Sequence, residues 1–143
     1  MIHYITLGGV ERPLTFAYSV AYEYEMQTGK FYEADVQDLA LQVVTAGAAI
    51  GTDDVATAAR SLSVVKFVDI LHACLVVGHR KTGKPVDFSK YDVADWAGGN
   101  MDAVSKFTTL LLQANFNLPG ESDTSAEVVA SEAGETKKKR PAR

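Results

Sequence analysis

The segment that most constrains the fold of this chain runs from residue 62 to residue 77, because it leaves almost no polar face on a helix. Its apolar members are Leu62, Val64, Val65, Phe67, Val68, Ile70, Leu71, Cys74, Leu75, Val76 and Val77. A helix that is apolar nearly all round is either central in a core or partly covered by another protein. A chain of 143 residues has the length of one ordinary domain, in which a fully encircled helix is hard to build. Both alternatives therefore stay open.

We expect this apolar helix to stop at Gly78 and not to cross a membrane. Its most apolar window, residues 70–78, lies between Asp69 and the basic run 79–81, and it holds about half of the ~20 residues that a span needs. The first nine residues have neither the basic start nor the apolar stretch of a signal peptide. The single cysteine cannot form an intramolecular disulfide. These features predict a soluble intracellular protein.

The N-terminal residues predict a β-hairpin followed by a helix. Residues 3–7 alternate in polarity, Gly8-Gly9 provides a two-residue turn, and residues 10–16 can return as a second strand. The apolar period then changes from two residues to the helical i, i+4 spacing, and Gly29 is placed to end the helix. Phe16, Val20 and Tyr24 share one helical face, and Tyr18, Tyr22 and Met26 share another.

Further helices are predicted along the rest of the chain. Asp35 is a plausible N-cap for a helix that runs to about Ile50, and residues 52–54 cap another helical stretch. Ser61 or Ser63 precedes the apolar helix, and residues 81–87 form a turn. A short helix at 92–96 and a last helix, capped by Asn100 or Asp102, complete the pattern. The fold class is mainly α with a short N-terminal β-hairpin, an α+β arrangement.

The composition changes after Phe116 and divides the chain into two parts. Residues 117–143 contain no aromatic residue and begin with small and polar side chains, which bury too little apolar area to offset the entropy of ordering. We therefore predict a folded domain at 1–116 and a disordered, charged tail at 117–143. The tail has equal numbers of acidic and basic residues, so the net charge of −4 belongs to the first 116 residues. An acidic domain is not typical of nucleic-acid binding, and no specific nucleic-acid partner is expected.

No constellation of residues predicts a reaction. Residues 78–84 match the letters of a phosphate-binding loop, but they follow a helix rather than a strand, and Pro85 stands where a Ser or Thr would hold magnesium. Asp69 and His72 can share a helical face, whereas Cys74 points away from them, so they do not complete a zinc site. We expect no catalytic residues, no cofactor and no bound metal.

The better functional feature is the tyrosine-rich helix. Tyrosines combine a large contact area with a polar tip and are enriched at protein interfaces. For the second face of this helix, a place in an interface and a place in the core are both open. Together with the broad apolar helix, it yields a candidate partner-binding set of Tyr18, Tyr22, Met26, Phe67, Leu71 and Leu75.

The order of these elements resembles that of the tail assembly chaperones of long-tailed bacteriophages and related gene-transfer particles. The residues that carry the resemblance are the strand, Gly8-Gly9, the Pro13-Leu14-x-Phe16 entry, and a helix that ends in Glu25-Met26-Gln27-Thr28-Gly29. These match the family's strand, Gly, strand entry and its Glu-x-x-Thr-Gly helix end. The resemblance covers about residues 2–50 and the rest only by helical character.

The resemblance implies a non-enzymatic role in the cytoplasm of an infected host. Members of the family are thought to coat the long helical tape-measure protein and to keep it soluble until tube subunits polymerise around it. They then leave, so this chain would be absent from the mature virion. The tape-measure protein is the implied partner, and the tail tube protein and a second copy of the chain are further candidates. A structural virion component, such as a tail-completion or connector protein, is the alternative, and a small enzyme or nucleotide-binding regulator is a third hypothesis.

Overall fold

The N-terminal hairpin forms around Gly8-Gly9, as its residues predict. In the computed structural model, which describes residues 1–50 and 62–116 with the side chains of 46–50 left out, β1 (Ile2–Leu7) pairs antiparallel with β2 (Val10–Thr15). Leu7 lies opposite Val10 at the closed end. Gly8 and Gly9 have φ angles of 65° and 74°, the left-handed conformations of a two-residue turn. This hairpin and the helices that follow confirm the predicted fold class.

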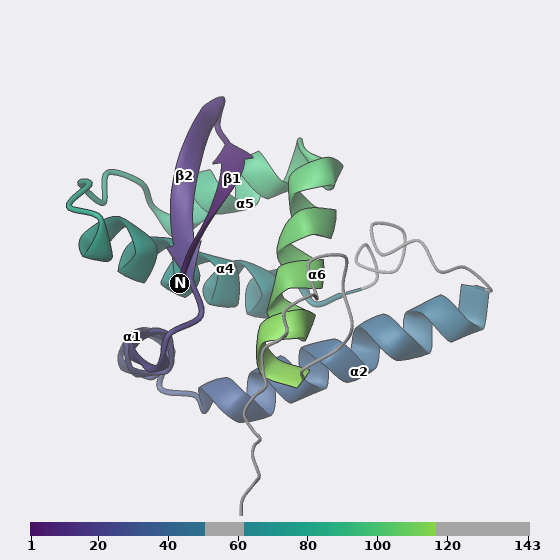
Figure 1. Ribbon diagram of the computed structural model, residues 1–143. Coiled ribbons are helices and arrows are strands. Elements are labelled where there is room, and N and C mark those ends of the chain that lie inside the picture. Colours follow the sequence, from purple (N-terminus) through teal and green to yellow (C-terminus); the bar gives the residue numbers. More distant parts are fainter. Residues whose placement is uncertain (51–61, 117–143) are drawn as a thin grey trace, which may run out of the picture.

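Five helices make up most of the described chain. They are α1 (Tyr18–Thr28), α2 (Tyr32–Ile50), α4 (Val64–Lys81), α5 (Lys90–Gly98) and α6 (Met101–Phe116). In Figure 1 the hairpin and α5 lie above α4, α1 and α2 lie below it, and α6 runs past it from top to bottom. The predicted helix after Thr52 and the predicted tail at 117–143 lie outside the described residues.

α4 is the central helix of the core. It packs against β2, α1, α2 and α5, and its side chains from Phe67 to His79 are buried with the exception of the half-buried Asp69. Of the two alternatives for an all-apolar helix, the structure shows the central one from Phe67 onward, while Val64 and Val65 in its first turn are exposed. The hairpin supplies the cover that helices alone would not, because β2 lies directly across α4.

The expected stop of α4 at Gly78 is wrong, since the helix continues to Lys81. Gly78 lies inside the helix at its closest approach to β2. A Cβ atom added at Gly78 would lie 2.5 Å from both the Leu14 Cα and the Pro13 carbonyl oxygen. The glycine is therefore required by packing between two elements and not by the end of a helix. At the other end, Ser63 is the N-cap, and its side chain accepts a hydrogen bond from the Lys66 N–H.

The other helix ends confirm some predicted caps and correct one. α1 ends at Gly29, whose φ is 73° and whose N–H donates to the Glu25 carbonyl at 2.9 Å. α2 begins at Tyr32 and not after Asp35, because a Glu25 carboxylate oxygen accepts the Tyr32 N–H at 3.1 Å. The cap of α2 thus comes from the preceding helix. α6 follows Asn100, whose side-chain oxygen accepts the Ala103 N–H at 3.1 Å.

The short helix α5 starts earlier than residue 92, because Ser89 and Asp92 form a capping box. It supports the turn of the hairpin. The Trp96 side chain packs on Gly8. The buried Arg12 guanidinium lies 4.1 Å from the centre of the Trp96 ring. Arg12 Nε also donates a hydrogen bond to the Leu7 carbonyl at 2.9 Å.

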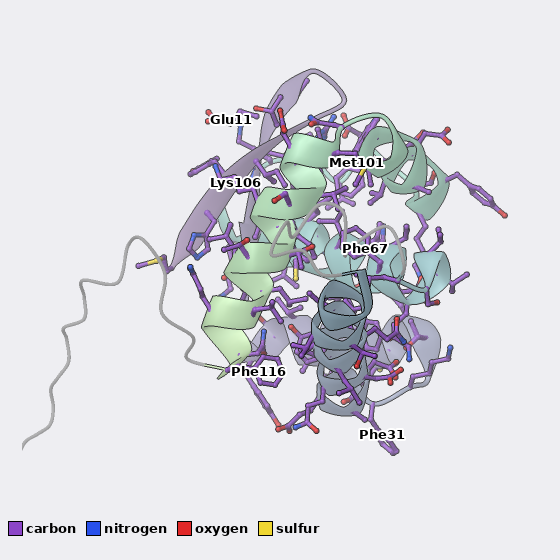
Figure 2. The ribbon with its side chains drawn as sticks, turned by 90° about the vertical axis from the view of Figure 1, so that its right-hand side faces the viewer. Glu11, Phe31, Phe67, Met101, Lys106 and Phe116 are labelled. Atoms are coloured by element: carbon purple, nitrogen blue, oxygen red, sulfur yellow. The ribbon has the colours of Figure 1, made fainter. Side chains whose placement is uncertain are left out.

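Each edge of the hairpin is partly blocked. On β1, the outward-facing carbonyls of Tyr4 and Thr6 accept hydrogen bonds from Lys106 Nζ at 3.0 Å and Asn100 Nδ2 at 3.1 Å. Figure 2 shows Lys106 on α6 beside the hairpin. On β2, Pro13 has no N–H to offer and lies opposite Tyr4.

Candidate partner-binding surface

One face of α1 is open to solvent and apolar. Tyr18, Tyr22 and Met26 are 92%, 68% and 69% exposed, while Val20 and Tyr24 on the opposite face are buried. Phe31, which follows the helix, is also 75% exposed and points outward in Figure 2. We call Tyr18, Tyr22 and Met26 the α1 ridge. The face with Val20 and Tyr24, which was predicted to pack on the hairpin, is thus in the core. The face with Tyr18, Tyr22 and Met26, for which core and interface were both possible, is on the surface.

The other half of the predicted partner-binding set is not available at the surface. Phe67, Leu71 and Leu75 are 7%, 1% and 0% exposed. They are buried because the hairpin and the other helices surround α4, and the Phe67 ring packs edge-on against Phe107 with 5.6 Å between ring centres. The prediction that these three side chains contact a partner is therefore contradicted by their place in the core.

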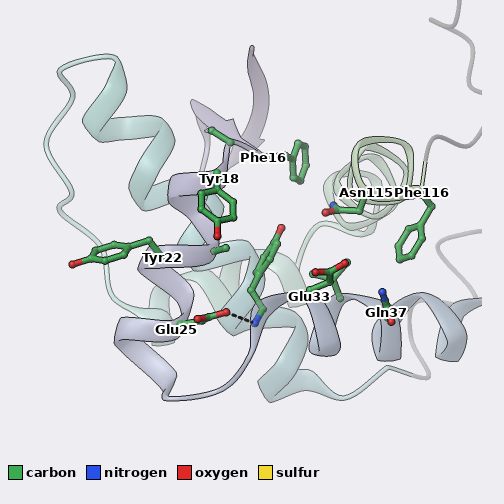
Figure 3. A pocket seen from close by; sticks show the side chains of 12 residues that line it. Phe16, Tyr18, Tyr22, Glu25, Glu33, Gln37, Asn115 and Phe116 are labelled. Carbon is green, nitrogen blue, oxygen red and sulfur yellow. Dashed lines mark hydrogen bonds between the residues drawn. The ribbon is translucent and has the colours of Figure 1, made fainter.

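A pocket lies beside the α1 ridge, between α1, the start of α2 and the end of α6. Its volume is about 440 Å³. Figure 3 shows Tyr18, Tyr22 and Glu25 on one side, Glu33 and Gln37 at the base, and Asn115 and Phe116 opposite. The lining residues are Phe16, Ala17, Tyr18, Ala21, Tyr22, Glu25, Tyr32, Glu33, Val36, Gln37, Asn115 and Phe116. The pocket was not predicted, because its walls come from segments up to a hundred residues apart.

Tyr32 forms the buried part of this pocket. Its side chain is only 8% exposed and packs edge-on against Tyr24 with 5.6 Å between ring centres. Its hydroxyl has no hydrogen-bond partner among the described residues. Burial raises the pKa of Tyr32 well above its ordinary value of 10, so the hydroxyl is protonated at neutral pH. A buried hydroxyl without a partner is unusual, and it faces a cavity large enough for a ligand.

The groups considered as metal ligands are paired with other residues. Asp69 forms an ion pair with Lys90 Nζ at 3.0 Å, and His72 Nδ1 lies 3.1 Å from the Gln27 side-chain oxygen. Cys74 is fully buried, and burial raises its pKa, so it is a neutral thiol. No group of three candidate ligands occurs within residues 1–50 and 62–116.

Residues 78–84, which match the letters of a phosphate-binding loop, lie at the C-terminal end of α4. The N–H groups of Thr82, Gly83 and Lys84 donate back to carbonyls of the last helical turn, with Lys84 bonding to the His79 carbonyl at 2.8 Å. A phosphate site needs N–H groups that point outward at the start of a helix, whereas this segment lies at the C-terminal end of a helix, where the dipole is negative. Within the described chain, no helix combines the length and apolar character needed to span a bilayer.

Searches against protein-family models, curated proteins and solved structures returned no match.

Proposed function

We propose that this chain is a non-enzymatic tail assembly chaperone that binds a helical tape-measure protein and keeps it soluble in the host cytoplasm. The observation that carries the proposal is the α1 ridge, an exposed apolar row on a helix with an open pocket beside it. Amphipathic helices dock through side chains repeated every three or four residues, and Tyr18, Tyr22 and Met26 repeat every four. The Glu-x-x-Thr-Gly helix end, which carries the family resemblance, lies on this same helix.

The dimensions of the ridge fit a protein that coats a long partner in many copies. From Tyr18 to Met26 the helix advances about 12 Å, at 1.5 Å per residue. One copy therefore covers only about two turns of a partner helix, and a long partner needs copies along its whole length. Tyrosine rings supply much contact area with few rotatable bonds, so little conformational entropy is lost when they bind.

Co-expression tests this proposal. The tape-measure protein encoded with this chain is expected to be insoluble alone and soluble when the chain is present. Tyr22→Asp introduces a charge into the ridge and is expected to abolish the effect without unfolding the domain, because Tyr22 is largely exposed. Tyr91→Asp on α5 is the matched control, since Tyr91 is also exposed but lies away from the ridge, and it is expected to retain the effect. Circular dichroism checks that both variants fold.

Two results would contradict the proposal. Undiminished solubilisation by a chain with Tyr18, Tyr22 and Met26 all replaced by Asp would remove the ridge from the interaction. Stoichiometric amounts of the chain in purified particles, measured by mass spectrometry, would make it a structural virion component such as a tail-completion or connector protein. The chaperone is expected to be absent from those particles.

A further inference from the structure

The polar groups of the pocket beside the α1 ridge share one chemical character, because they offer oxygen acceptors and none carries a positive charge. Glu25 and Glu33 contribute carboxylates, and Glu33 makes no ion pair with any described residue. Asn115 donates one of its two amide N–H groups to the Leu111 carbonyl at 2.9 Å, and its side-chain oxygen is a further acceptor. No Lys, Arg or His is among the lining residues. The nearby Asp35 carboxylate is already engaged by the Tyr24 hydroxyl and Lys66.

The buried Tyr32 hydroxyl adds an independent indication that the pocket is a binding site. It is more than nine-tenths buried, it lines the cavity, and no described residue satisfies it. Its oxygen can accept a hydrogen bond from a donor that enters the pocket. Such a donor would compensate the loss of hydration at this hydroxyl.

Aromatic walls and carboxylates at the rim together select a cationic side chain. The rings of Phe16, Tyr18, Tyr32 and Phe116 surround the cavity, whereas the Tyr22 ring points away from it in Figure 3. The faces of aromatic rings attract ammonium and guanidinium groups, and the methylene stem of Lys or Arg packs on the same rings. An anion would meet Glu25 and Glu33, and a purely apolar ligand would leave the Tyr32 hydroxyl without a partner.

A source of such side chains lies in the same chain. The run Lys137-Lys138-Lys139-Arg140 begins 21 residues after Phe116, which is itself a wall of the pocket. Twenty-one residues can span up to about 70 Å, so the reach of the segment is no restriction. The first 116 residues have a net charge of −4, which attracts this run. A site tethered to its own ligand also sees it at an effective concentration in about the millimolar range, so weak contacts suffice.

We propose that the pocket is a binding site for a lysine or arginine side chain and that its occupant in the free protein is the 137–140 run of the same chain. Because Tyr18 belongs both to the pocket and to the α1 ridge, the bound run covers part of the ridge. A partner that docks on the ridge must displace it. This site does not depend on the proposed chaperone function.

Paramagnetic NMR on the full chain tests the site. Ala142→Cys introduces a thiol for a nitroxide label, while the fully buried Cys74 stays unlabelled. The expected result is a loss of amide intensity for residues of α1 and the first turn of α2, and none at the far tip of the hairpin around Gly9. Mixing the labelled chain with an excess of unlabelled, isotopically silent chain distinguishes binding within one molecule, which is unaffected, from binding between copies.

Two charge variants of the labelled chain make the test specific. Replacing residues 137–140 with glutamine is expected to restore the intensities, and so is the double variant Glu25→Gln with Glu33→Gln, in which glutamine can still accept the Tyr32 N–H. The control Glu11→Gln with Asp95→Asn removes the same charge from other surfaces and is expected to keep the loss. Salt at about 1 M, where the Debye length is about 3 Å, is also expected to restore the signals.

The proposal is overturned by any of three outcomes. The first is no change of amide intensity in α1. The second is a loss of intensity that persists when residues 137–140 are neutral. The third is a loss of intensity that disappears on dilution with unlabelled chain, which would assign the contact to a second copy. Solubilisation of the tape-measure protein is a separate measurement, so failure here leaves the proposed function standing, and the reverse also holds.

Discussion

At the scale of single residues, Gly78 marks a close contact between two elements, where β2 crosses α4. The apolar pattern of residues 62–77 predicts a helix correctly, and a glycine after such a run ordinarily indicates its end. What decides the role of Gly78 is the neighbouring strand, which lies 64 residues earlier in the chain at Leu14. Sequence spacing alone contains no information about that contact. The same limit explains Phe67, Leu71 and Leu75, because periodicity identifies an apolar face but not what covers it.

We predict that Gly78→Ala destabilises the protein, because the added methyl group meets β2 backbone atoms at 2.5 Å and backbone cannot move aside as a side chain can. The expected loss is about 1–3 kcal/mol in the free energy of unfolding, measured by urea denaturation. Gly98→Ala is the matched control, since a methyl group there meets no atom within 4 Å. Equal stability of the two variants would show that the helix and the strand separate easily.

Histidines give the molecule a predicted dependence on pH. Burial is the largest cause that lowers the pKa of His3, His72 and His79 below the ordinary value of 6.5. Above that value both the folded and the unfolded chain hold them neutral. As the pH falls below 6.5 the unfolded chain binds protons that the folded chain does not, so stability decreases. The charged groups that act on His72 and His79 are Lys90, Glu23, Asp69, Arg12, Asp87 and Lys84.

We therefore expect the free energy of unfolding to be level above about pH 7 and to decline between pH 6.5 and about pH 5. His72→Gln and His79→Asn each remove one titrating group and are expected to make the decline shallower. His79→Asn keeps a donor for the Pro85 carbonyl, which His79 Nδ1 contacts at 3.0 Å. A curve that rises on acidification would contradict the assignment of neutral, buried imidazoles.

At the scale of elements, the hairpin is the feature that the sequence predicts best, since its alternation and its Gly8-Gly9 turn are local. The packing of the hairpin turn on α5 is not local, and it makes the two glycines different. Both have positive φ angles, but a Cβ atom at Gly8 would lie 2.6 Å from the Trp96 ring, whereas one at Gly9 meets nothing within 4 Å. A side chain at either position would strain the backbone, but only a side chain at Gly8 would also meet α5.

The two substitutions should therefore differ. Gly9→Ala is expected to cost about 1–2 kcal/mol from the left-handed backbone alone, and Gly8→Ala more than that. Trp96 is the single tryptophan, so its fluorescence reports directly on the turn. Gly8→Ala should shift that emission, and Gly9→Ala should not. If the Trp96 emission of Gly8→Ala is the same as that of Gly9→Ala, the hairpin turn does not pack on α5.

At the scale of the whole molecule, the core and the pocket differ in how far sequence can predict them. The α1 ridge was recognisable because Tyr18, Tyr22 and Met26 share a helical spacing. Tyr32, Glu33, Asn115 and Phe116 carry no shared pattern, and only the meeting of three helices makes them neighbours. A pocket of this kind follows from tertiary packing, for which one sequence holds no direct signal.

The core also predicts what a shortened chain would do. The described core residues lie between Ile5 and Leu111. A chain that ends at residue 116 is therefore expected to unfold in one cooperative transition, with a melting temperature lowered by no more than a few degrees through loss of the pocket's own ligand. Thermal circular dichroism measures this. A broad, non-cooperative transition would mean that residues 117–143 contribute to the core.

The partly blocked edges of the hairpin have a consequence for how this molecule can associate. An open strand edge can recruit a strand from any other chain, and edge-to-edge pairing is a common route to aggregation. Here Lys106 of α6 and Asn100, which precedes that helix, bond the Tyr4 and Thr6 carbonyls of β1, and Pro13 removes a donor from the β2 edge. A third strand would have to displace these bonds on one side and do without a hydrogen bond on the other. The small sheet is therefore a poor template for growth from one molecule into the next.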